Sequence, residues 1–305
     1  TPADLYADAY AYIFVIFLGI PAVFLYNLLA CVIRALGDSR TPVYFLALSA
    51  GLNIGLDLAF ILLFHWGVAG AAIATVASQA VSGAACLVYM VRRFPILHLT
   101  REERRPSLDA CKTLCAMGLP MGLQYSITAI GSIVMQTAVN GLGSVYVTAV
   151  ATANKLQQLL TCPFDAMGSA MATYCGQNVG AGRLDRLRQG VRSCSALGLG
   201  YSVLAFVAML FLAPQATMLF LDPAEGGLDT LVALTAQYTV VLTAFFFPLA
   251  LVNILRFSIQ GMGFSALAIL AGVLEMIART VVGRFFVPGV GYTAACFASP
   301  AAWIC

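Results

Sequence analysis

The sequence predicts an all-α membrane protein that crosses the bilayer several times. Hydrophobic residues make up 61% of the chain and charged residues only 10%, whereas soluble domains contain about 45–50% and about 25% of these classes. The mean hydropathy of +0.92 is too high for a chain whose surface faces water. In addition, the basic residues gather in every second connection between long apolar segments. These observations predict a polytopic helical bundle in the cell (inner or plasma) membrane.

Nine apolar segments are candidates for the membrane helices. They are residues 10–33, 42–64, 68–91, 113–140, 145–174, 194–221, 231–260, 264–287 and 290–305. A span needs roughly 20 residues to cross about 30 Å of hydrocarbon, and eight segments meet this length. The ninth would reach only about 24 Å at about 1.5 Å per residue. Because Thr1 also opens without an initiator Met or a signal-peptide pattern, we expect sequence to be missing at both ends.

The connections between these segments alternate in charge. Twelve of the sixteen Lys and Arg residues lie at 34–40, 92–112 and 183–192, and the uncharged turn 261–263 follows Arg256. The intervening connections contain no Lys or Arg and carry acids instead, namely Asp4, Asp8, Asp222, Glu225 and Asp229. Since basic loops remain on the cytoplasmic side during insertion, the alternation predicts the orientation of every span.

The longest polar stretch divides the chain. We predict a cytoplasmic linker at 93–112, containing a short amphipathic surface helix, between one lobe at 1–92 and another at 113–305. A weak internal repeat with an offset of 226 crosses this linker. It pairs Tyr12, Asn27, Gly37 and Ser39 with Tyr238, Asn253, Gly263 and Ser265. Duplicated bundles are typical of transporters, and the repeat predicts three further helices upstream of residue 1, although chance similarity is an open alternative.

Ionisable residues inside the spans are candidates for function, because each costs about 2.5–3.5 kcal/mol to insert at mid-bilayer. They are Asp57, Lys155, Asp165, Arg256, Glu275, Arg279 and Arg284. Glu275 and Arg279 are four residues apart, so they share a helix face and either form an internal ion pair or handle protons. Asp57 shares a face with Asn53 and Ser49, which indicates either helix packing or a place on the translocation path.

Polar residues form a stripe along two neighbouring helices. Gln124, Thr128, Ser132, Gln136 and Asn140 recur at every fourth residue, and the next helix, which we expect Pro163 to interrupt, carries Asn154, Lys155, Gln157, Gln158, Thr161 and Asp165. Such stripes either bond neighbouring helices, at about 0.6 kcal/mol for each bond, or line a water-filled cavity. We favour the cavity. The residues predicted to line the substrate path are Gln124, Gln136, Asn140, Asn154, Gln158, Asn253 and Arg256.

The sequence contains no enzymatic signature. Its two histidines, His65 and His98, lie at a span end and in the linker, so no His-based catalytic pair or metal site is available. The nine cysteines lack zinc spacing. Pro21, Pro163 and Pro248 fall within spans and are typical of helices that bend. We therefore expect no enzyme, cofactor, metal or nucleic-acid partner.

Several motifs resemble the multidrug and toxic compound extrusion (MATE) transporters, most closely their DinF-like bacterial branch. In the first lobe these are RALGDSRTP (34–42) and GVAGAAIAT (67–75). In the second they are GLP (118–120), GQNVGAG (176–182), QGMG (260–263) and PAAW (300–303). The resemblance implies a fold of two six-helix lobes, of which about nine of twelve helices are present here. Helices four to six would lie in 1–92 and helices seven to twelve, the last incomplete, in 113–305.

The resemblance also implies multidrug efflux by cation-coupled antiport of small amphipathic, often cationic compounds. The carboxylate expected in the first helix of the bacterial branch has no counterpart here. The acids of the sodium-type pattern are replaced by Gln124, Gln136, Asn253 and Arg256. The coupling ion, H+ or Na+, therefore stays open, and the candidate coupling residues are Asp57, Asp165 and Glu275.

Two alternatives stay open from sequence. A flippase for lipid-linked intermediates or polysaccharides, from the same superfamily, would be expected to line its cavity with several cationic residues. An intramembrane hydrolase would need a Ser/His, Asp/Asp or metal constellation within the spans, and none is visible. The expected partners are therefore small amphipathic, possibly cationic compounds, H+ or Na+, and the lipid bilayer.

Overall fold

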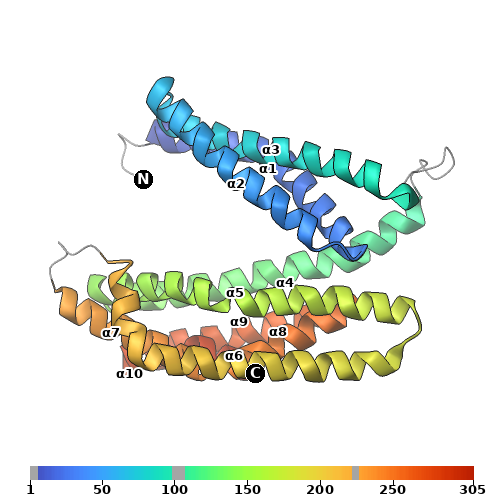
Figure 1. Cartoon of the computed structure of the whole chain (residues 1–305). Helices are drawn as coiled ribbons and strands as arrows, with labels where there is room; N and C mark the ends of the chain where they lie inside the picture. The colour runs from blue at the N-terminus through green and yellow to red at the C-terminus, as the bar shows by residue number, and fades with distance from the viewer. Residues whose placement is uncertain (1–5, 98–106, 222–226) are drawn as a thin grey trace. The chain divides into compact units, whose positions relative to one another are not determined.

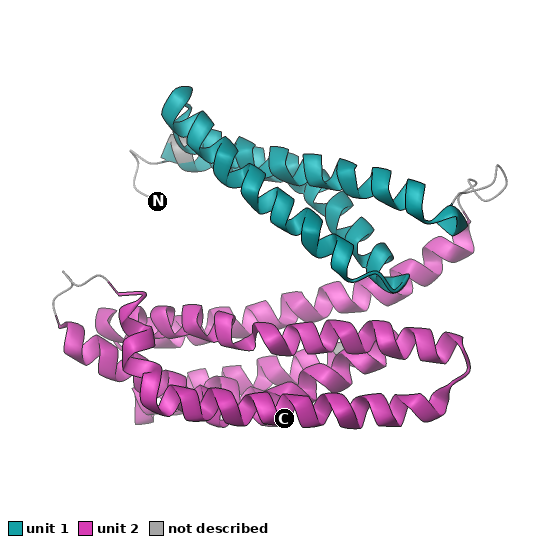
Figure 2. Cartoon of the chain, viewed as in Figure 1, with its two compact units in different colours: residues 1–106 teal, residues 107–305 magenta. Residues whose placement is uncertain are grey.

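The computed structural model describes residues 6–97, 107–221 and 227–305, and helices account for nearly all of them (Figure 1). This confirms the predicted all-α membrane fold. The chain divides into two compact units, unit 1 (Thr1–Pro106) and unit 2 (Ser107–Cys305), shown in Figure 2. Their boundary falls within the predicted linker. The short amphipathic helix expected there lies largely outside the described residues.

Unit 1 is a bundle of three long helices. Its elements are α1 (Tyr6–Ala35), α2 (Arg40–Leu58), the π-helix η2 (Ala59–Leu63), α3 (Gly67–Arg93) and the short 3-10 helix η3 (Pro95–Leu97). Helix α3 packs against both α1 and α2. The buried core is small and consists of Leu29, Ile33 and Cys86, surrounded by partly buried aromatic side chains. Most other apolar side chains point outward, as expected of helices that face lipid.

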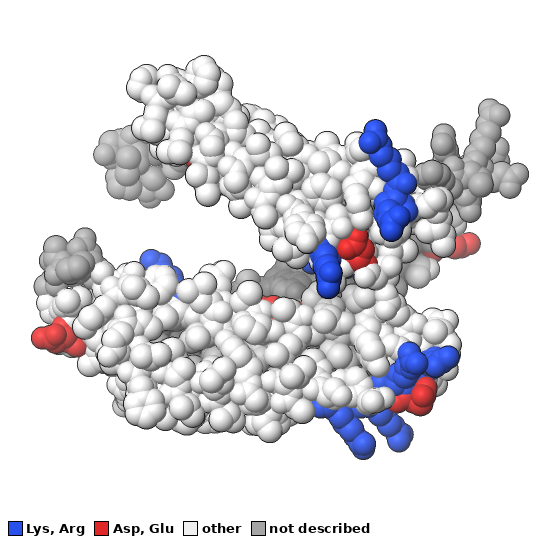
Figure 3. Space-filling model, viewed as in Figure 1, with Lys and Arg blue, Asp and Glu red and all other residues white. Residues whose placement is uncertain are grey.

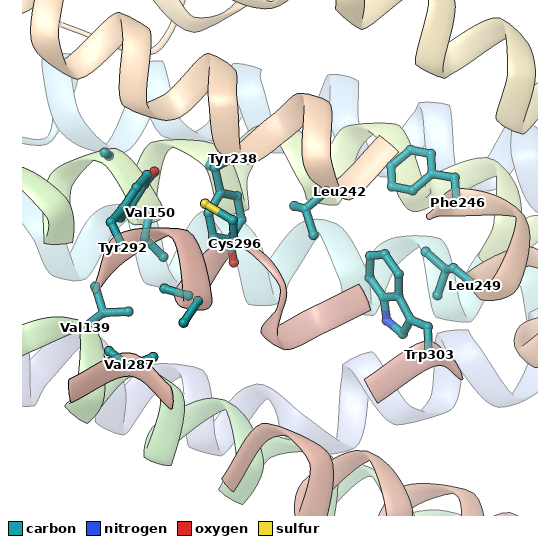
Figure 4. Packing of buried hydrophobic residues seen from close by; sticks show 14 of the residues in the cluster. Val139, Val150, Tyr238, Leu242, Phe246, Leu249, Val287, Tyr292, Cys296 and Trp303 are labelled. Carbon is teal, nitrogen blue, oxygen red and sulfur yellow. The ribbon is translucent and has the colours of Figure 1, made fainter. Parts of the chain in front are cut away.

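Unit 2 contains the remaining helices. They are α4 (Leu108–Asn140), α5 (Ser144–Gly180), α6 (Leu184–Met218), α7 (Leu228–Ala244), α8 (Phe246–Gly261), α9 (Ala266–Val281), the π-helix η4 (Val282–Phe286), α10 (Val287–Val290), α11 (Tyr292–Cys296) and α12 (Ala298–Ile304). Helix α4 pairs with α9, α5 with α8, and α6 with α7. The short C-terminal helices fill the centre: Tyr292, Cys296 and Trp303 pack against Tyr238 and Phe246 (Figure 4).

Four of the predicted spans are divided in the structure, the first being 42–64, where α2 passes into η2, and prolines explain two of these divisions. The 231–260 segment bends by 52° between α7 and α8. Pro248 lacks the N–H that would bond the carbonyl of Ala244, where α7 ends. Likewise Pro288 lacks the N–H that would bond the carbonyl of Arg284, four residues earlier. Arg284 lies in the π-helix η4, near the end of the 264–287 segment. Segment 290–305 is divided into α11 and α12 without such a cause.

The predicted interruption at Pro163 is wrong, because α5 runs unbroken through that residue. The carbonyl that loses its donor at Pro163 is that of Leu159, four residues earlier. The next carbonyl, that of Leu160, accepts a hydrogen bond from the Tyr201 hydroxyl of α6 at 2.9 Å, so the neighbouring helix packs closely on this turn.

Four described helices are long and apolar enough by themselves to cross a membrane. They are Ala9–Ala35, Arg40–Leu63, Gly67–Arg93 and Leu184–Met218, and the bent α7–α8 pair is a fifth candidate. The sequence predicted eight spans of sufficient length. Helices α4 and α5 have 33 and 37 residues, but their polar stripes lower their hydropathy, and the last segments are divided into short pieces. Described Lys and Arg side chains nevertheless gather toward one end of unit 2, as the loop charges predict (Figure 3).

Three helices end in the same backbone turn. Gly37, Gly182 and Gly263 have φ angles of 93°, 69° and 96°, in the region that other residues rarely adopt. The residue after each glycine donates its N–H to the carbonyl five residues earlier, at 3.2, 2.8 and 3.1 Å, which is the Schellman arrangement. Gly37 and Gly263 are the pair matched by the internal repeat. Both α2 and α9, which follow these two turns, end in a π-helix.

Candidate functional site

The polar stripes of α4 and α5 face a cavity inside unit 2. Of two adjoining cavities there, this is the larger, with a volume of about 380 Å³, and we call it the larger cavity. Its walls come from α4, α5, α7, α9 and α12: Ser132, Met135, Gln136, Val139, Val150, Asn154, Gln157, Gln158, Thr161, Tyr238, Arg279 and Ser299. Of the predicted path residues, Gln136, Asn154 and Gln158 line it. Asn140 does not, but it accepts a hydrogen bond from the Gln136 amide at 3.0 Å.

A smaller cavity of about 190 Å³ adjoins the first. Gln157, Thr161 and Arg279 line both. The other residues that line the smaller cavity are Gln124, Tyr125, Thr128, Asp165, Leu249, Asn253, Arg256, Glu275 and Trp303. All the predicted path and coupling residues of unit 2 except Asn140 therefore line one of these cavities, but they divide between the two. Charged groups concentrate in the smaller one and neutral polar groups in the larger.

Glu275 lies between two guanidinium groups. Its Oε1 is 3.5 Å from Nη1 of Arg256, and its Oε2 is 4.0 Å from Nη2 of Arg279. All three side chains are less than 15% exposed. The predicted Glu275–Arg279 pair is present, but Glu275 is closer to Arg256, which lies on a different helix, α8. Because an isolated charge is very unfavourable in an apolar interior, this mutual pairing stabilises all three groups there.

Hydrogen bonds extend this network across four helices. Arg256 Nη2 donates to Oδ1 of Asn253 at 2.6 Å, and Asn253 Nδ2 donates to Oδ1 of Asp165 at 3.3 Å. At the other end, Nη1 of Arg279 donates to Oγ of Ser132 at 2.9 Å and to the carbonyl of Thr128 at 3.5 Å. A continuous polar chain therefore runs from α5 through α8 and α9 to α4. In a low-dielectric interior, such bonds are stronger than in water.

Gln124 and Gln260 form a separate bond beside this network. Nε2 of Gln260 donates to Oε1 of Gln124 at 3.0 Å, and both side chains are buried. Gln124 thus joins α4 to the end of α8, and it also belongs to the wall of the smaller cavity. For this residue both interpretations of a polar stripe hold, because it bonds a neighbouring helix and also faces a cavity.

In unit 1, polar residues lie between α2 and α3. Asn53 Nδ2 donates to Oγ1 of Thr75 at 3.4 Å, and Ser49 is only 2% exposed. One turn beyond Asn53, the Oδ1 atom of Asp57 is buried and has no hydrogen-bond partner among the described residues. The same holds for Oε1 of Gln79. Unpaired buried oxygens are rare in native proteins, and each has a cause such as strain, a functional role, or a bound water or ion.

Several residues were not predicted to line the unit 2 cavities. Arg279 was recognised from sequence only as half of an ion pair, yet it lines both cavities. Tyr238 and Ser299 come from helices for which no cavity-facing stripe was predicted, although Thr235, Thr239 and Thr243 recur at every fourth residue of α7 beside Tyr238. Lys155 belongs to the stripe but is exposed and lines neither cavity. Among the described residues, no group of three or more His, Cys, Asp and Glu could hold a metal ion.

The chain is similar to a recognised family and to curated members of it. A family model described as MatE matches residues 1–59 and 120–284. The probable multidrug resistance protein YpnP of Bacillus subtilis is 33% identical over 187 residues, 61% of this chain and 42% of the relative. The FAD transporter of Shewanella oneidensis is 25% identical over 202 residues, 63% of this chain and 43% of the relative. The chain thus spans less than half the length of these curated relatives.

Solved structures share the fold. An outward-facing multidrug resistance MATE transporter of the MOP superfamily superimposes with a TM-score of 0.87 at 20% identity, covering 96% of this chain and 66% of that one. A variant of the Vibrio cholerae MATE transporter VcmN gives 0.89 at 19% identity, covering 100% and 68%. A MOP superfamily transporter from Pyrococcus furiosus, described as having a binding pocket of reverse polarity, gives 0.86 at 20% identity, covering 96% and 67%.

Proposed function

Because the chain belongs to the MatE family of multi-pass membrane proteins, we propose that it exports small organic compounds across the cell membrane in exchange for H+ or Na+. The larger cavity of unit 2 carries this proposal. Its volume of about 380 Å³ lies within the range of small-molecule sites, about 300–1,000 Å³. Gln136, Asn154 and Gln158 are exposed to it rather than buried between helices.

The cavity's composition favours transport over the two alternatives. A flippase for lipid-linked intermediates would be expected to present several cationic groups, and Arg279 is the one charged side chain among the described residues that line the larger cavity. A hydrolase would need a nucleophile and a base in contact. Among the described lining residues of either cavity there is no histidine or cysteine. The neutral amides and hydroxyls there are suited to binding a compound without transforming it.

We propose Asp57 as the leading candidate for cation coupling. Asp165 and Glu275, the other candidates, already have hydrogen-bond or ion-pair partners. The buried Oδ1 of Asp57 has none among the described residues, so a proton or Na+ would satisfy it at each transport cycle. Asn53, one turn earlier in α2, adds an amide oxygen on the same helix face, and its Nδ2 bonds Thr75 of α3.

An efflux assay tests the function. Cells that express the protein should accumulate less rhodamine 6G or carboxyfluorescein than cells with an empty vector. A proton uncoupler in sodium-free buffer should abolish this difference if H+ is the coupling ion, and added Na+ should restore it if Na+ is. Equal accumulation in both cell lines, across cationic and anionic dyes, would overturn the proposed function.

The Asp57→Asn variant tests the coupling residue. We expect it to lose most of the efflux, because an amide can neither take up a proton nor offer a charged ligand to Na+. Asp229→Asn is the matched control, since Asp229 is an exposed acid near the start of α7. Full efflux by Asp57→Asn would remove Asp57 from consideration and leave Asp165 and Glu275.

A further inference from the structure

The relatives do not agree on the charge of the substrate, since one is named a transporter of FAD, an anion, and another a multidrug resistance protein, so the charges around the larger cavity must decide it. In the polar network of unit 2, the two carboxylates flank Arg256. Glu275 is 3.5 Å from one of its nitrogens, and Asp165 is linked to it through Asn253. Arg279 therefore has one carboxylate nearby, that of Glu275 at 4.0 Å, and this carboxylate also pairs with Arg256. That separation is beyond the normal length of a hydrogen bond.

The hydrogen bonds of Arg279 use only one of its two terminal nitrogens. Nη1 is occupied by Ser132 and by the carbonyl of Thr128, which are both neutral. Nε is buried and has no hydrogen-bond partner among the described residues. Nη2 lies 4.0 Å from Glu275, too far for a hydrogen bond, so it is the donor that a carboxylate or phosphate oxygen could bind.

The surroundings of Arg279 add no negative charge on the side of the larger cavity. None of the described residues that line that cavity is acidic, and the others are neutral amides, hydroxyls and three apolar side chains. A cation that entered it would meet the guanidinium, and the nearest carboxylate, that of Glu275, lines the smaller cavity and is shared with Arg256. An anion would gain a charge-assisted hydrogen bond in surroundings of low dielectric.

We infer that the larger cavity of unit 2 selects organic anions, with Arg279 binding their carboxylate or phosphate group. This inference rests on the proposed transport function and specifies its substrate class. It differs from the expectation of cationic substrates that the family resemblance implies. The amides of Gln136, Asn154 and Gln158 would bond the remaining polar groups of the substrate.

Two dyes with the same xanthene core and opposite charge test the inference. Purified protein in detergent is titrated with carboxyfluorescein, an anion, and with rhodamine 6G, a cation, and binding is followed by fluorescence anisotropy. We expect the anion to bind more tightly. Arg279→Gln should weaken anion binding by roughly tenfold or more, the usual effect of losing a charge-assisted hydrogen bond, and should leave or improve cation binding. Arg279→Lys, which keeps the charge without the planar fork, should be intermediate.

Arg284→Gln is the matched control, because Arg284 is exposed on the neighbouring π-helix and lines neither cavity. Benzoate and phenyl phosphate, added as competitors, distinguish a carboxylate site from a phosphate site. Displacement of carboxyfluorescein by either compound supports the inference, and displacement by neither overturns it.

A second pair of variants keeps the test valid if the Arg279 variants fail to fold. Gln136 is exposed to the larger cavity and is not part of the buried network. Gln136→Lys should tighten anion binding and Gln136→Glu should weaken it, with the opposite order for the cation. Tighter binding of rhodamine 6G than of carboxyfluorescein by the wild type overturns the anion preference. Unchanged binding of both dyes in the two Arg279 variants and the two Gln136 variants overturns it as well. Neither result affects the proposed transport function, which depends only on efflux.

Discussion

Units 1 and 2 differ in the kind of polar atom that each leaves unpaired. In unit 1 the buried atoms without a hydrogen-bond partner include the carboxylate Oδ1 of Asp57 and the amide oxygen of Gln79, which can only accept. In unit 2 they include Nε of Arg279, which can only donate. Unpaired hydroxyl oxygens occur in both units and do not distinguish them.

A buried oxygen that lacks a donor can be satisfied by a proton or a cation, whereas a guanidinium N–H that lacks an acceptor can be satisfied by an anion. Under the function proposed above, unit 1 would therefore hold the coupling cation and unit 2 the substrate. A transporter built this way need not use one set of residues for both ligands. Four predictions can break or sharpen this comparison, and they follow from the largest expected effect to the smallest.

Removing one carboxylate from each unit should have very different effects on stability. Glu275→Gln takes away the partner shared by two buried guanidinium groups, and breaking a buried ion pair typically costs about 3–5 kcal/mol. Asp57→Asn should change the free energy of unfolding by less than about 1 kcal/mol, because the Oδ1 atom it alters has no partner to lose. Thermal unfolding in detergent measures both. Equal destabilisation would show that Asp57 is a structural residue, and the comparison would fail.

Helix packing shows a similar contrast. A Cβ atom added at Gly261 would lie 2.7 Å from Cα and 2.8 Å from the carbonyl carbon of Ala172, so α8 contacts the backbone of α5 directly. Gly261→Ala should therefore destabilise unit 2 by about 1–3 kcal/mol or more, as overpacking does. At Gly83 in unit 1 the nearest atoms belong to Tyr26 and are 3.5 Å away, so Gly83→Ala should be tolerated. Unfolding temperatures of the two variants that differ by less than their error would contradict this.

The repeated turns should respond alike in both units. Gly37 and Gly263 both have strongly positive φ angles, and neither has an atom within 4 Å of an added Cβ. Replacement by alanine should therefore cost about 1–2 kcal/mol at each, from backbone strain alone. Gly118→Ala is the control, because this helical glycine has open space and no unusual φ, and alanine there should stabilise by up to about 1 kcal/mol. A cost at only one of the two turns would argue against the internal repeat.

Much of this fold follows from local sequence. Apolar runs predicted where the helices lie, and glycines at 37, 182 and 263 mark helix ends, because a turn of positive φ favours glycine wherever it occurs. The bend at Pro248 follows from its missing N–H. The same reasoning failed at Pro163, because whether a proline breaks a helix depends on the tertiary packing around it and not on the missing N–H alone.

The site was less accessible to prediction. The polar stripe on α4 and α5 indicated a cavity because its spacing is local. The Arg256–Glu275 contact joins two helices, and no spacing rule brings these residues together until the helices are packed. The same holds for Tyr238 and Ser299, which reach the larger cavity from helices for which no cavity-facing stripe was predicted. Arg279 was assigned a partner correctly, but its second role as a cavity wall depends on which face α9 turns inward.

The smallest expected effect concerns the turn between α1 and α2. Oδ1 of Asp38 accepts the N–H groups of Arg40 and Thr41 at 3.2 and 3.0 Å, and Oδ2 accepts the hydroxyl of Tyr89 on α3 at 2.9 Å. These bonds, chiefly those from Thr41, lower the pKa of Asp38 below its ordinary value of 3.8. Asn keeps one oxygen acceptor but removes the negative charge, so Asp38→Asn should destabilise unit 1 by at most about 1 kcal/mol at pH 7, the usual effect of a charge near a helix N-terminus.

The pH dependence of this effect separates the Asp38 charge from a general loss of packing. A carboxyl whose pKa is lowered in the folded state contributes its stability fully above the unfolded value, and loses it as the pH falls through the folded value. The difference between wild type and Asp38→Asn should therefore be constant from pH 7 to about pH 5 and should shrink below about pH 4. Ser107→Ala is the matched control in unit 2, because Ser107 caps α4 with a neutral hydroxyl at 3.4 Å. Its smaller effect should not vary over the same range, and a parallel decline in both variants would mean that the acid acts on the fold as a whole.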